Sequence, residues 1–221
     1  MNFKTVIFDL DGTLLDTIQD IAYSMNTVLE RHHFAPHSSE SYKMMVGDGA
    51  VQLVQRALPH DCRDNRLAEQ LAVEFRETYA RFWSMTTCLY PGVTELLDTL
   101  TSLEIKIGVL SNKDHEFTVR AVRVLLPGWF FDAVEGAREG KPHKPDPLAV
   151  QSVLEKMNSI PGETVMIGDS DHDIISARQA GVFAVGALWG YRDRAVLERA
   201  GADMLIGNPV DLLKLLLYRG S

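Results

Sequence analysis

Short apolar runs alternate with amphipathic segments along most of this chain, and this alternation constrains the fold more than any other feature. Helical spacing of apolar residues is visible after Pro91-Gly92 and again over residues 146–157. Strands that alternate with helices form a parallel sheet with helices on both faces. The sequence therefore predicts an α/β fold, with strands near residues 6–8, 105–110, 164–169, 182–188 and 203–207.

Residues 15–88 interrupt this rhythm, because they contain few strand signals and several helical ones. In the stretch "RLAEQLAVEFRETYARFW" the large apolar residues recur at helical spacing, which is typical of a helix that packs on a core. A helical block inserted after the first strand predicts a second, smaller domain. We expect an α/β core formed by residues 1–14 and 89–221, and a helical domain over residues 15–88, joined by hinges.

Composition excludes several classes of function. The 221 residues carry a formal net charge of -8, from 22 basic and 30 acidic side chains, which disfavours binding to nucleic acid or to an anionic membrane. Cys62 and Cys88 show no metal-ligand spacing, so neither a disulfide framework nor a zinc site is expected. A strand starting near Lys4 leaves no room for a signal peptide, so a cytoplasmic protein is expected. The sequence leaves the oligomeric state open between a monomer and a dimer.

Polar residues follow three of the predicted strands at the point where each strand ends. Asp9 and Asp11 follow the first, Ser111-Asn112 follows the second, and Asp169 closes the third, with Asp173 just beyond. Ligands of open parallel sheets bind outside the carboxyl ends of the strands. The sequence therefore predicts one site at this edge of the sheet.

Several carboxylates at one edge require compensation. A like-charge pair about 4 Å apart costs about 4 kcal/mol at an effective dielectric constant of 20. Clustered carboxylates without a soft ligand favour a hard cation such as Mg2+. A lysine in "GKPHKPDP", either Lys141 or Lys144, would also help. A calcium loop is disfavoured, because the sixth position counted from Asp9 is Leu14 and not the required glycine, and because a strand precedes the loop.

Four motifs resemble those of the haloacid dehalogenase superfamily, in the same order along the chain: "DLDGT", "LSN", "KPDP" and "GDSDHD". The helical insert resembles the mobile cap of that superfamily. The resemblance implies a Rossmann-like core with an inserted helical cap. The stretches "DLDGTLLDT", "VGDGAVQLVQRAL" and "GDSDHDIISARQAG", the last followed by "WGYRD", are most similar to phosphoglycolate phosphatases and their close relatives.

The resemblance also implies a role for each acidic residue. Asp9 would attack phosphorus and form an aspartyl-phosphate, as a nucleophile that divides one difficult step into two. Asp11 would protonate the leaving alcohol and then deprotonate the hydrolytic water. Mg2+ would be held by the Asp9 carboxylate, the Asp11 backbone carbonyl and Asp169. Asp173 would lie behind these ligands and orient metal-bound water or a lysine.

The remaining motif residues would bind the phosphoryl group. Ser111 and Asn112 would contact its oxygens, and Lys144, which fits the spacing of the family, would neutralise charge on Asp9 and on the phosphate. Backbone N–H groups through Gly12 would line the position of the developing negative charge.

The implied function is a Mg2+-dependent phosphatase acting on a small phosphorylated metabolite such as 2-phosphoglycolate. A sugar phosphomutase, a pyrophosphatase and a nucleotidase of the same superfamily are the alternatives. A non-enzymatic scaffold is disfavoured, because every position that the chemistry needs is filled. In the insert, Gly47-Asp48-Gly49 departs from the usual Gly-Asn-Gly form, and its contact with substrate is left open.

Overall fold

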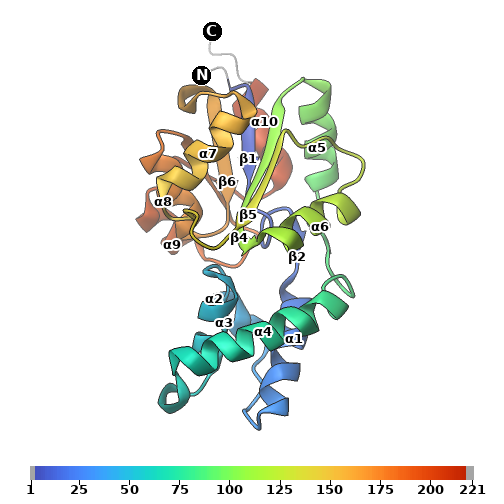
Figure 1. The fold of residues 1–221 in the computed structure, drawn as a ribbon. Helices are drawn as coiled ribbons and strands as arrows, with labels where there is room; N and C mark the ends of the chain where they lie inside the picture. The colour runs from blue at the N-terminus through green and yellow to red at the C-terminus, as the bar shows by residue number, and fades with distance from the viewer. Residues whose placement is uncertain (1–2, 218–221) are drawn as a thin grey trace. The chain divides into compact units, whose positions relative to one another are not determined.

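The computed structural model describes residues 3–217 and divides into two compact units. One unit contains the chain up to Leu15 and from Leu89 onward, and the other contains Asp16–Cys88. Figure 1 shows the first as a sheet with helices around it and the second as a group of helices. Two short strands, β2 (Leu15–Asp16) and β3 (Cys88–Leu89), pair with each other and contain the unit boundary.

The first unit is built on a six-stranded sheet in the order β5-β4-β1-β6-β7-β8. Each neighbouring pair is parallel, and the predicted α/β fold is confirmed. β1 lies between β4 and β6. The chain continues from β1 to β4 and β5 on one side of it, and then returns to the other side to form β6, β7 and β8. The strands are β1 (Thr5–Phe8), β4 (Lys106–Asp114), β5 (Ala133–Ala137), β6 (Thr164–Gly168), β7 (Phe183–Ala187) and β8 (Met204–Ile206).

The sequence did not predict β5, which forms one edge of the sheet. Its residues, Ala133-Val134-Glu135-Gly136-Ala137, include one β-branched side chain and a glycine, so they carry little strand signal. Four of the five residues are only half-buried. The strand forms because β4 offers it a free edge to pair with, and this is a tertiary contact that no local pattern shows.

Helices cover both faces of the sheet. Right-handed crossovers place α5 (Val93–Ser102) and α6 (His115–Leu125) on one face, because the strand order reverses at β1. α7 (Pro147–Met157), α8 (Asp171–Gln179) and α9 (Arg194–Ala200) cover the other face. Their apolar side chains form one core with residues of β1 and β6. α10 (Leu212–Leu217) contacts α5, and short 3-10 turns span His60–Cys62, Pro161–Glu163 and Pro209–Asp211.

Local sequence sets where α7 and α8 begin. The side chain of Asp146 accepts a hydrogen bond from Leu148 N, and Pro147 occupies the first turn of α7. Ser170 and Asp173 form a reciprocal capping box at the start of α8. These caps fix the loops that lead from the strand ends into the helices, and those loops carry the polar motifs.

The second unit consists of four helices, α1 (Ile18–Arg31), α2 (Ser39–Met45), α3 (Gly49–Ala57) and α4 (Asn65–Phe82). Of the predicted apolar stripe of α4, Leu71, Phe75 and Tyr79 are buried. Asp20, buried near the start of α1, accepts hydrogen bonds from the amides and hydroxyls of Thr86 and Thr87. This contact ties the segment after α4 to the start of α1.

The loop before α3 contains Asp48, whose flanking glycines both have positive φ, 121° at Gly47 and 81° at Gly49. Glycine suits these positions because it adopts left-handed backbone without a Cβ clash. The Asp48 carboxylate forms an ion pair with Arg56, so its charge is compensated within the same unit.

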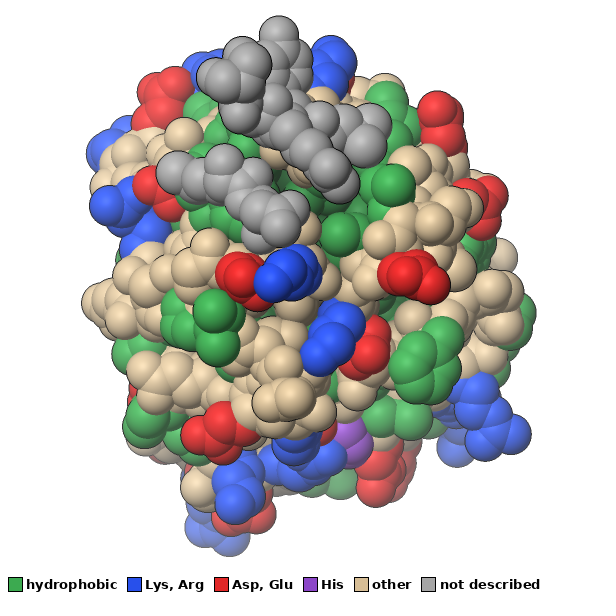
Figure 2. Space-filling model, turned by 90° about the horizontal axis from the view of Figure 1, so that it is seen from above, with side chains coloured by type: hydrophobic (Ala, Val, Ile, Leu, Met, Phe, Trp, Pro, Cys, Tyr) green, Lys and Arg blue, Asp and Glu red, His purple; other side chains and the backbone are tan. Residues whose placement is uncertain are grey.

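Charged side chains of both signs lie on the surface. On the face shown in Figure 2, acidic and basic side chains are interspersed over the surface. None of the helices among residues 3–217 combines the length and the apolar character needed to cross a bilayer. Cys62 and Cys88 are free thiols.

Candidate active site

The adjacent strands β4, β1 and β6 each end in polar residues. These strand ends meet beside β1, the point at which the strand order of the sheet reverses. Asp9 follows β1, Asp169 follows β6, and Ser111 and Asn112 lie in the last part of β4. This is the crevice in which open parallel sheets bind ligands. The structure therefore places the predicted polar residues at one edge of the sheet.

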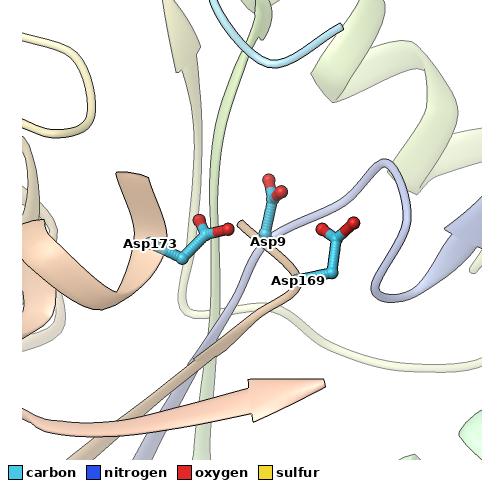
Figure 3. A group of neighbouring side chains, drawn as sticks. All are labelled: Asp9, Asp169 and Asp173. Atoms are coloured by element: carbon cyan, nitrogen blue, oxygen red, sulfur yellow. The ribbon is translucent and has the colours of Figure 1, made fainter. Parts of the chain in front are cut away.

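Three buried carboxylates form the centre of this edge. One oxygen from each of Asp9, Asp169 and Asp173 lies within 4.8 Å of the others. Figure 3 shows Asp9 and Asp169 on the loops after β1 and β6, while Asp173 on α8 turns its carboxylate toward Asp9. The Asp11 side chain is not a member of this group, and it contacts a lysine instead.

Lys144 lies against two of these carboxylates. Its Nζ is 2.8 Å from Asp9 Oδ1 and 2.6 Å from Asp173 Oδ1, and its side chain is 2% exposed. The second oxygen of Asp173 accepts hydrogen bonds from Ser170 N, at 3.0 Å, and from Ser170 Oγ, at 2.5 Å. Lys141, the other lysine of this stretch, is exposed. Of the two, only Lys144 therefore reaches the carboxylates.

Burial and crowding shift the ionisation of these groups. Burial, with the nearby Asp173 and Asp11 charges, raises the pKa of Asp9 to about 7, although the Lys144 ammonium opposes this shift. Burial and the charges of Asp9 and Asp173 likewise raise the pKa of Asp169 to about 8. Burial alone would lower the pKa of Lys144, but Asp173 and Asp9 outweigh it and raise this pKa. One ammonium does not fully compensate the carboxylates.

The donor set fits a divalent cation. Asp9 Oδ1 is buried and makes no well-directed hydrogen bond, although it lies in ion-pair contact with Lys144. Both oxygens of Asp173 accept hydrogen bonds from Lys144 or Ser170, whereas Asp9 Oδ1 accepts none, so Asp9 is the carboxylate best able to bind a cation. Hard cations prefer oxygen ligands of this kind. Buried, undercompensated carboxylates are therefore compatible with a divalent metal site.

The tight turn at Gly12 lies against Asp169. A Cβ on Gly12, whose φ is 85°, would lie 2.3 Å from Asp169 Oδ2, so only glycine fits there. The N–H of Gly12 donates to Leu15 O at 2.8 Å, so this amide is engaged within its own loop. The effect of Gly12 visible here is steric, and its contact with substrate stays a prediction.

Residues that the sequence reasoning did not single out hold Asp169 in place. Tyr191 N donates to Asp169 Oδ2 at 2.7 Å, and Thr13 Oγ1 donates to Oδ1 at 3.3 Å. Trp189 Nε1 donates to the carbonyl oxygen of Thr13 at 3.0 Å and so links the two loops. The stretch "WGYRD", noted only as a family cue, is the sequence signal for this arrangement.

Replacement of Gly190 by alanine is expected to disturb this arrangement. The new Cβ would lie 2.2 Å from Asp169 Cβ and 2.5 Å from the carbonyl oxygen of Gly12. Overpacking of this kind costs about 1–3 kcal/mol, so the thermal unfolding midpoint of Gly190→Ala should fall. Gly162→Ala is the control, because nothing lies within 4 Å of its Cβ position. Equal midpoints for the two variants would contradict the proposed clash.

The end of β4 supplies a further set of contacts. Asn112 and the backbone of Lys144 exchange two hydrogen bonds, at 2.7 and 3.0 Å, which fixes the loop that carries this lysine. Lys113, which sequence reasoning missed, contacts both oxygens of Asp11. Its only sequence signal is its position directly after Ser111-Asn112 at the end of a strand.

Comparison with known proteins identifies the family. Residues 6–187 match the family model described as haloacid dehalogenase-like hydrolase. The curated phosphoglycolate phosphatase of Pseudomonas putida is 32% identical over 209 residues, which is 93% of this chain and 76% of the relative. That of Chromobacterium violaceum is 32% identical over 218 residues, which is 97% of each protein.

Solved structures agree with this assignment. A protein from Lactobacillus delbrueckii, described provisionally as a phosphoglycolate phosphatase, superimposes with a TM-score of 0.91 at 27% identity, covering 98% of this chain and 99% of the other. A predicted phosphoglycolate phosphatase from Haemophilus somnus gives a TM-score of 0.89 at 26% identity, covering 97% and 98%. The motifs, the parallel sheet with its buried carboxylates and the matched residues agree, and the chain belongs to the haloacid dehalogenase-like hydrolases.

Proposed function

We propose that this protein is a Mg2+-dependent phosphatase that hydrolyses a small phosphomonoester resembling 2-phosphoglycolate. The observation that carries this proposal is the buried Asp9 carboxylate at the end of β1, beside Lys144 and Asp169. The relatives named phosphoglycolate phosphatase support the substrate class.

In the proposed reaction, an Asp9 carboxylate oxygen bonds to phosphorus while the bond from phosphorus to the ester oxygen breaks. Asp11, carrying a proton, gives it to the departing alkoxide oxygen, so the alcohol leaves neutral. The Asp11 carboxylate then takes a proton from a water molecule whose oxygen attacks phosphorus. This second displacement releases inorganic phosphate and restores Asp9.

The other residues prepare the site for these steps. Asp9, Asp169 and the backbone carbonyl of Asp11 would hold Mg2+, which when bound neutralises negative charge on the transferring phosphoryl group. Asp173 holds the Lys144 ammonium in place through its 2.6 Å contact. Ser111, Asn112 and Lys144, with Gly12, would bind the phosphoryl oxygens, and the short contact between Asn112 and the Lys144 backbone keeps these groups together.

In this proposal, residues 15–88 form a cap domain, and residues 1–14 and 89–221 form the catalytic core. In this view the two connections near the unit boundary act as hinges, and closure would exclude water from the nucleophile. The acidic net charge of -8 agrees with a small-molecule substrate that is drawn in by local cations, and not with a nucleic acid partner. Free thiols at Cys62 and Cys88 suit a cytoplasmic, reducing location.

Mg2+ binding is expected to release protons and to strengthen with pH. Asp9 and Asp169, with pKa values of about 7 and about 8, are largely protonated at pH 6 and must ionise to bind a cation. The apparent affinity should therefore rise between pH 6 and pH 8, by up to about tenfold per pH unit for each proton displaced. Titration calorimetry at pH 6.5 in two buffers of different ionisation enthalpy measures this release. Identical heats in both buffers would count against it.

The experiment that tests the function is phosphate release across a panel of phosphorylated metabolites, with Mg2+ and with chelator. We expect turnover of 2-phosphoglycolate or a similar small phosphomonoester in Mg2+ and none in chelator. β-Glucose 1-phosphate, pyrophosphate and nucleoside monophosphates test the mutase, pyrophosphatase and nucleotidase alternatives. Absence of turnover of every phosphomonoester, or full activity in chelator, would remove the proposal.

A further inference from the structure

We propose that Lys113 is a positioning residue for Asp11, and that it holds the acid–base carboxylate in the orientation that both proton transfers require. This inference rests on the proposed phosphatase function. It assigns a role to a side chain that lies beside the four motifs and that the roles proposed above leave unused.

The contact itself is bidentate. Lys113 Nζ lies 3.0 Å from Asp11 Oδ1 and 2.9 Å from Asp11 Oδ2. The side chains of Lys113 and Asp11 are 8% and 18% exposed, so water screens this pair only weakly. A charge that contacts both oxygens restricts rotation of the carboxylate, because turning it lengthens at least one of the two contacts.

The backbone on the lysine side is firmly held. The pairing of β4 with β5 shifts register between Leu110 and Asp114, and such irregularities re-aim side chains at strand ends. Lys113 N donates to Ser111 Oγ at 3.3 Å, and Lys113 O accepts from Thr118 Oγ1 at 3.1 Å. The neighbouring strand approaches so closely that a Cβ on Gly136 would lie 2.6 Å from Lys113 O. The ammonium therefore extends from a fixed point.

The backbone on the carboxylate side is also held. Asp11 forms an isolated bridge with Leu15, and the next amide, that of Gly12, donates to Leu15 O at 2.8 Å. With both backbones fixed, the remaining freedom of Asp11 lies in its side-chain torsions. The Lys113 contact is what restrains these torsions.

Two lysines pair with the two carboxylates of the first motif, one lysine for each. Lys144 contacts Asp9 and Asp173, whereas Lys113 contacts Asp11. Loss of Lys113 should therefore impair the steps in which Asp11 moves a proton and spare the attack of Asp9 on phosphorus. This separation can be measured, because the need for a proton depends on the leaving group.

The test compares an alkyl phosphate with p-nitrophenyl phosphate in wild type, Lys113→Met and the control Lys141→Met, in which an exposed lysine is replaced. Nitrophenolate leaves without a proton, so the first step with this substrate does not need Asp11. Hydrolysis of the aspartyl-phosphate still needs it. Stopped-flow absorbance resolves the first turnover, and a labelled phosphoryl group retained on quenched protein reports the intermediate.

For Lys113→Met we expect turnover of the alkyl phosphate to fall about 100-fold, as for a misplaced acid–base group. With p-nitrophenyl phosphate we expect a burst near one product per site at close to the wild-type rate, a slow steady state and accumulated phosphoenzyme. Lys141→Met should match wild type in every measurement. Lys113→Met is expected to lower the thermal unfolding midpoint, because it leaves Asp11 without its cation, and the burst near the wild-type rate shows that the site is still folded.

Other outcomes overturn the inference. Equal losses in the burst and in the steady state would mean that Lys113 acts on the phosphoryl group or on the fold, and unchanged kinetics would mean that Asp11 needs no such support. A wild-type protein that turns over neither substrate would instead contradict the proposed function, and the inference with it. A wild type that is active, combined with a Lys113→Met variant that lacks the burst, would contradict the inference alone.

Discussion

An Asp9→Asn variant is expected to lose phosphatase turnover by about 10^4-fold or more, the scale seen when a nucleophile is removed from an enzyme. Asparagine has nearly the same shape as aspartate, but its amide oxygen is a poor nucleophile. The loss should appear in the maximal rate, and no phosphoenzyme should be trapped. Phosphate release under saturating Mg2+ measures the effect.

The same variant should keep or gain stability, which separates chemistry from folding. Since burial raises the pKa of Asp9 to about 7, the contribution of this group to stability is lost as the pH rises through that value. In chelator, the unfolding midpoint of the wild type should therefore fall from pH 6 to pH 8, and that of Asp9→Asn should fall less.

The control for Asp9→Asn is Asp64→Asn, because Asp64 is an exposed cap of α4 and asparagine caps equally well. Its activity and its unfolding midpoint should equal those of the wild type. Substantial turnover by Asp9→Asn would remove Asp9 as the nucleophile. A midpoint well below that of the wild type would show that the lost activity reflects damage to the fold.

A Lys144→Met variant is expected to show the largest loss of stability. It removes an ammonium that is 2% exposed and pairs with both Asp9 and Asp173, leaving these carboxylates without their cation. Breaking a buried ion pair from one side typically costs about 3–5 kcal/mol. Chemical denaturation in chelator at pH 8 measures the change in the free energy of unfolding.

The loss for Lys144→Met should depend on pH in a defined direction. At pH 6 the orphaned carboxylates can bind protons, which relieves their repulsion. Lys144 lowers the pKa of Asp9 in the wild type, so without this lysine the ionisation of Asp9 costs more free energy as the pH rises to 8. The gap between variant and wild type should thus widen from pH 6 to pH 8. Lys141→Met, an exposed replacement in the same stretch, should show no gap. A gap that is constant across pH would argue against repulsion as the cause.

Most of the sheet was predictable because its strands are local patterns. The runs around β1, β6 and β7 are buried on both faces, so their apolar side chains are continuous along the chain. β5 was missed because an edge strand with a glycine and a half-buried glutamate has no such run. Its pairing with β4 is decided by a neighbour that is distant along the chain.

The candidate site, like the sheet, was predictable from the sequence only in part. Asp9, Asp169 and Ser111 could be placed together because each stands at the end of a strand, and parallel strands end at one edge. The sequence could not show that Asp173 is buried in contact with Lys144. This contact depends on how α8 packs against the loop that carries the lysine. Lys113 and Asp11 are 102 positions apart in the chain, and neither the sequence around Lys113 nor that around Asp11 indicates that they pair.

By itself, the sequence determined the α/β class, the edge at which the polar residues gather, and the surplus of carboxylates there. These follow from periodicity and from the position of a residue within its strand, both of which are local properties. Only the tertiary structure decided which lysine compensates which carboxylate, and which turns must be glycine to make room for Asp169. Those choices depend on distances of a few ångströms between separate loops, and packing sets such distances.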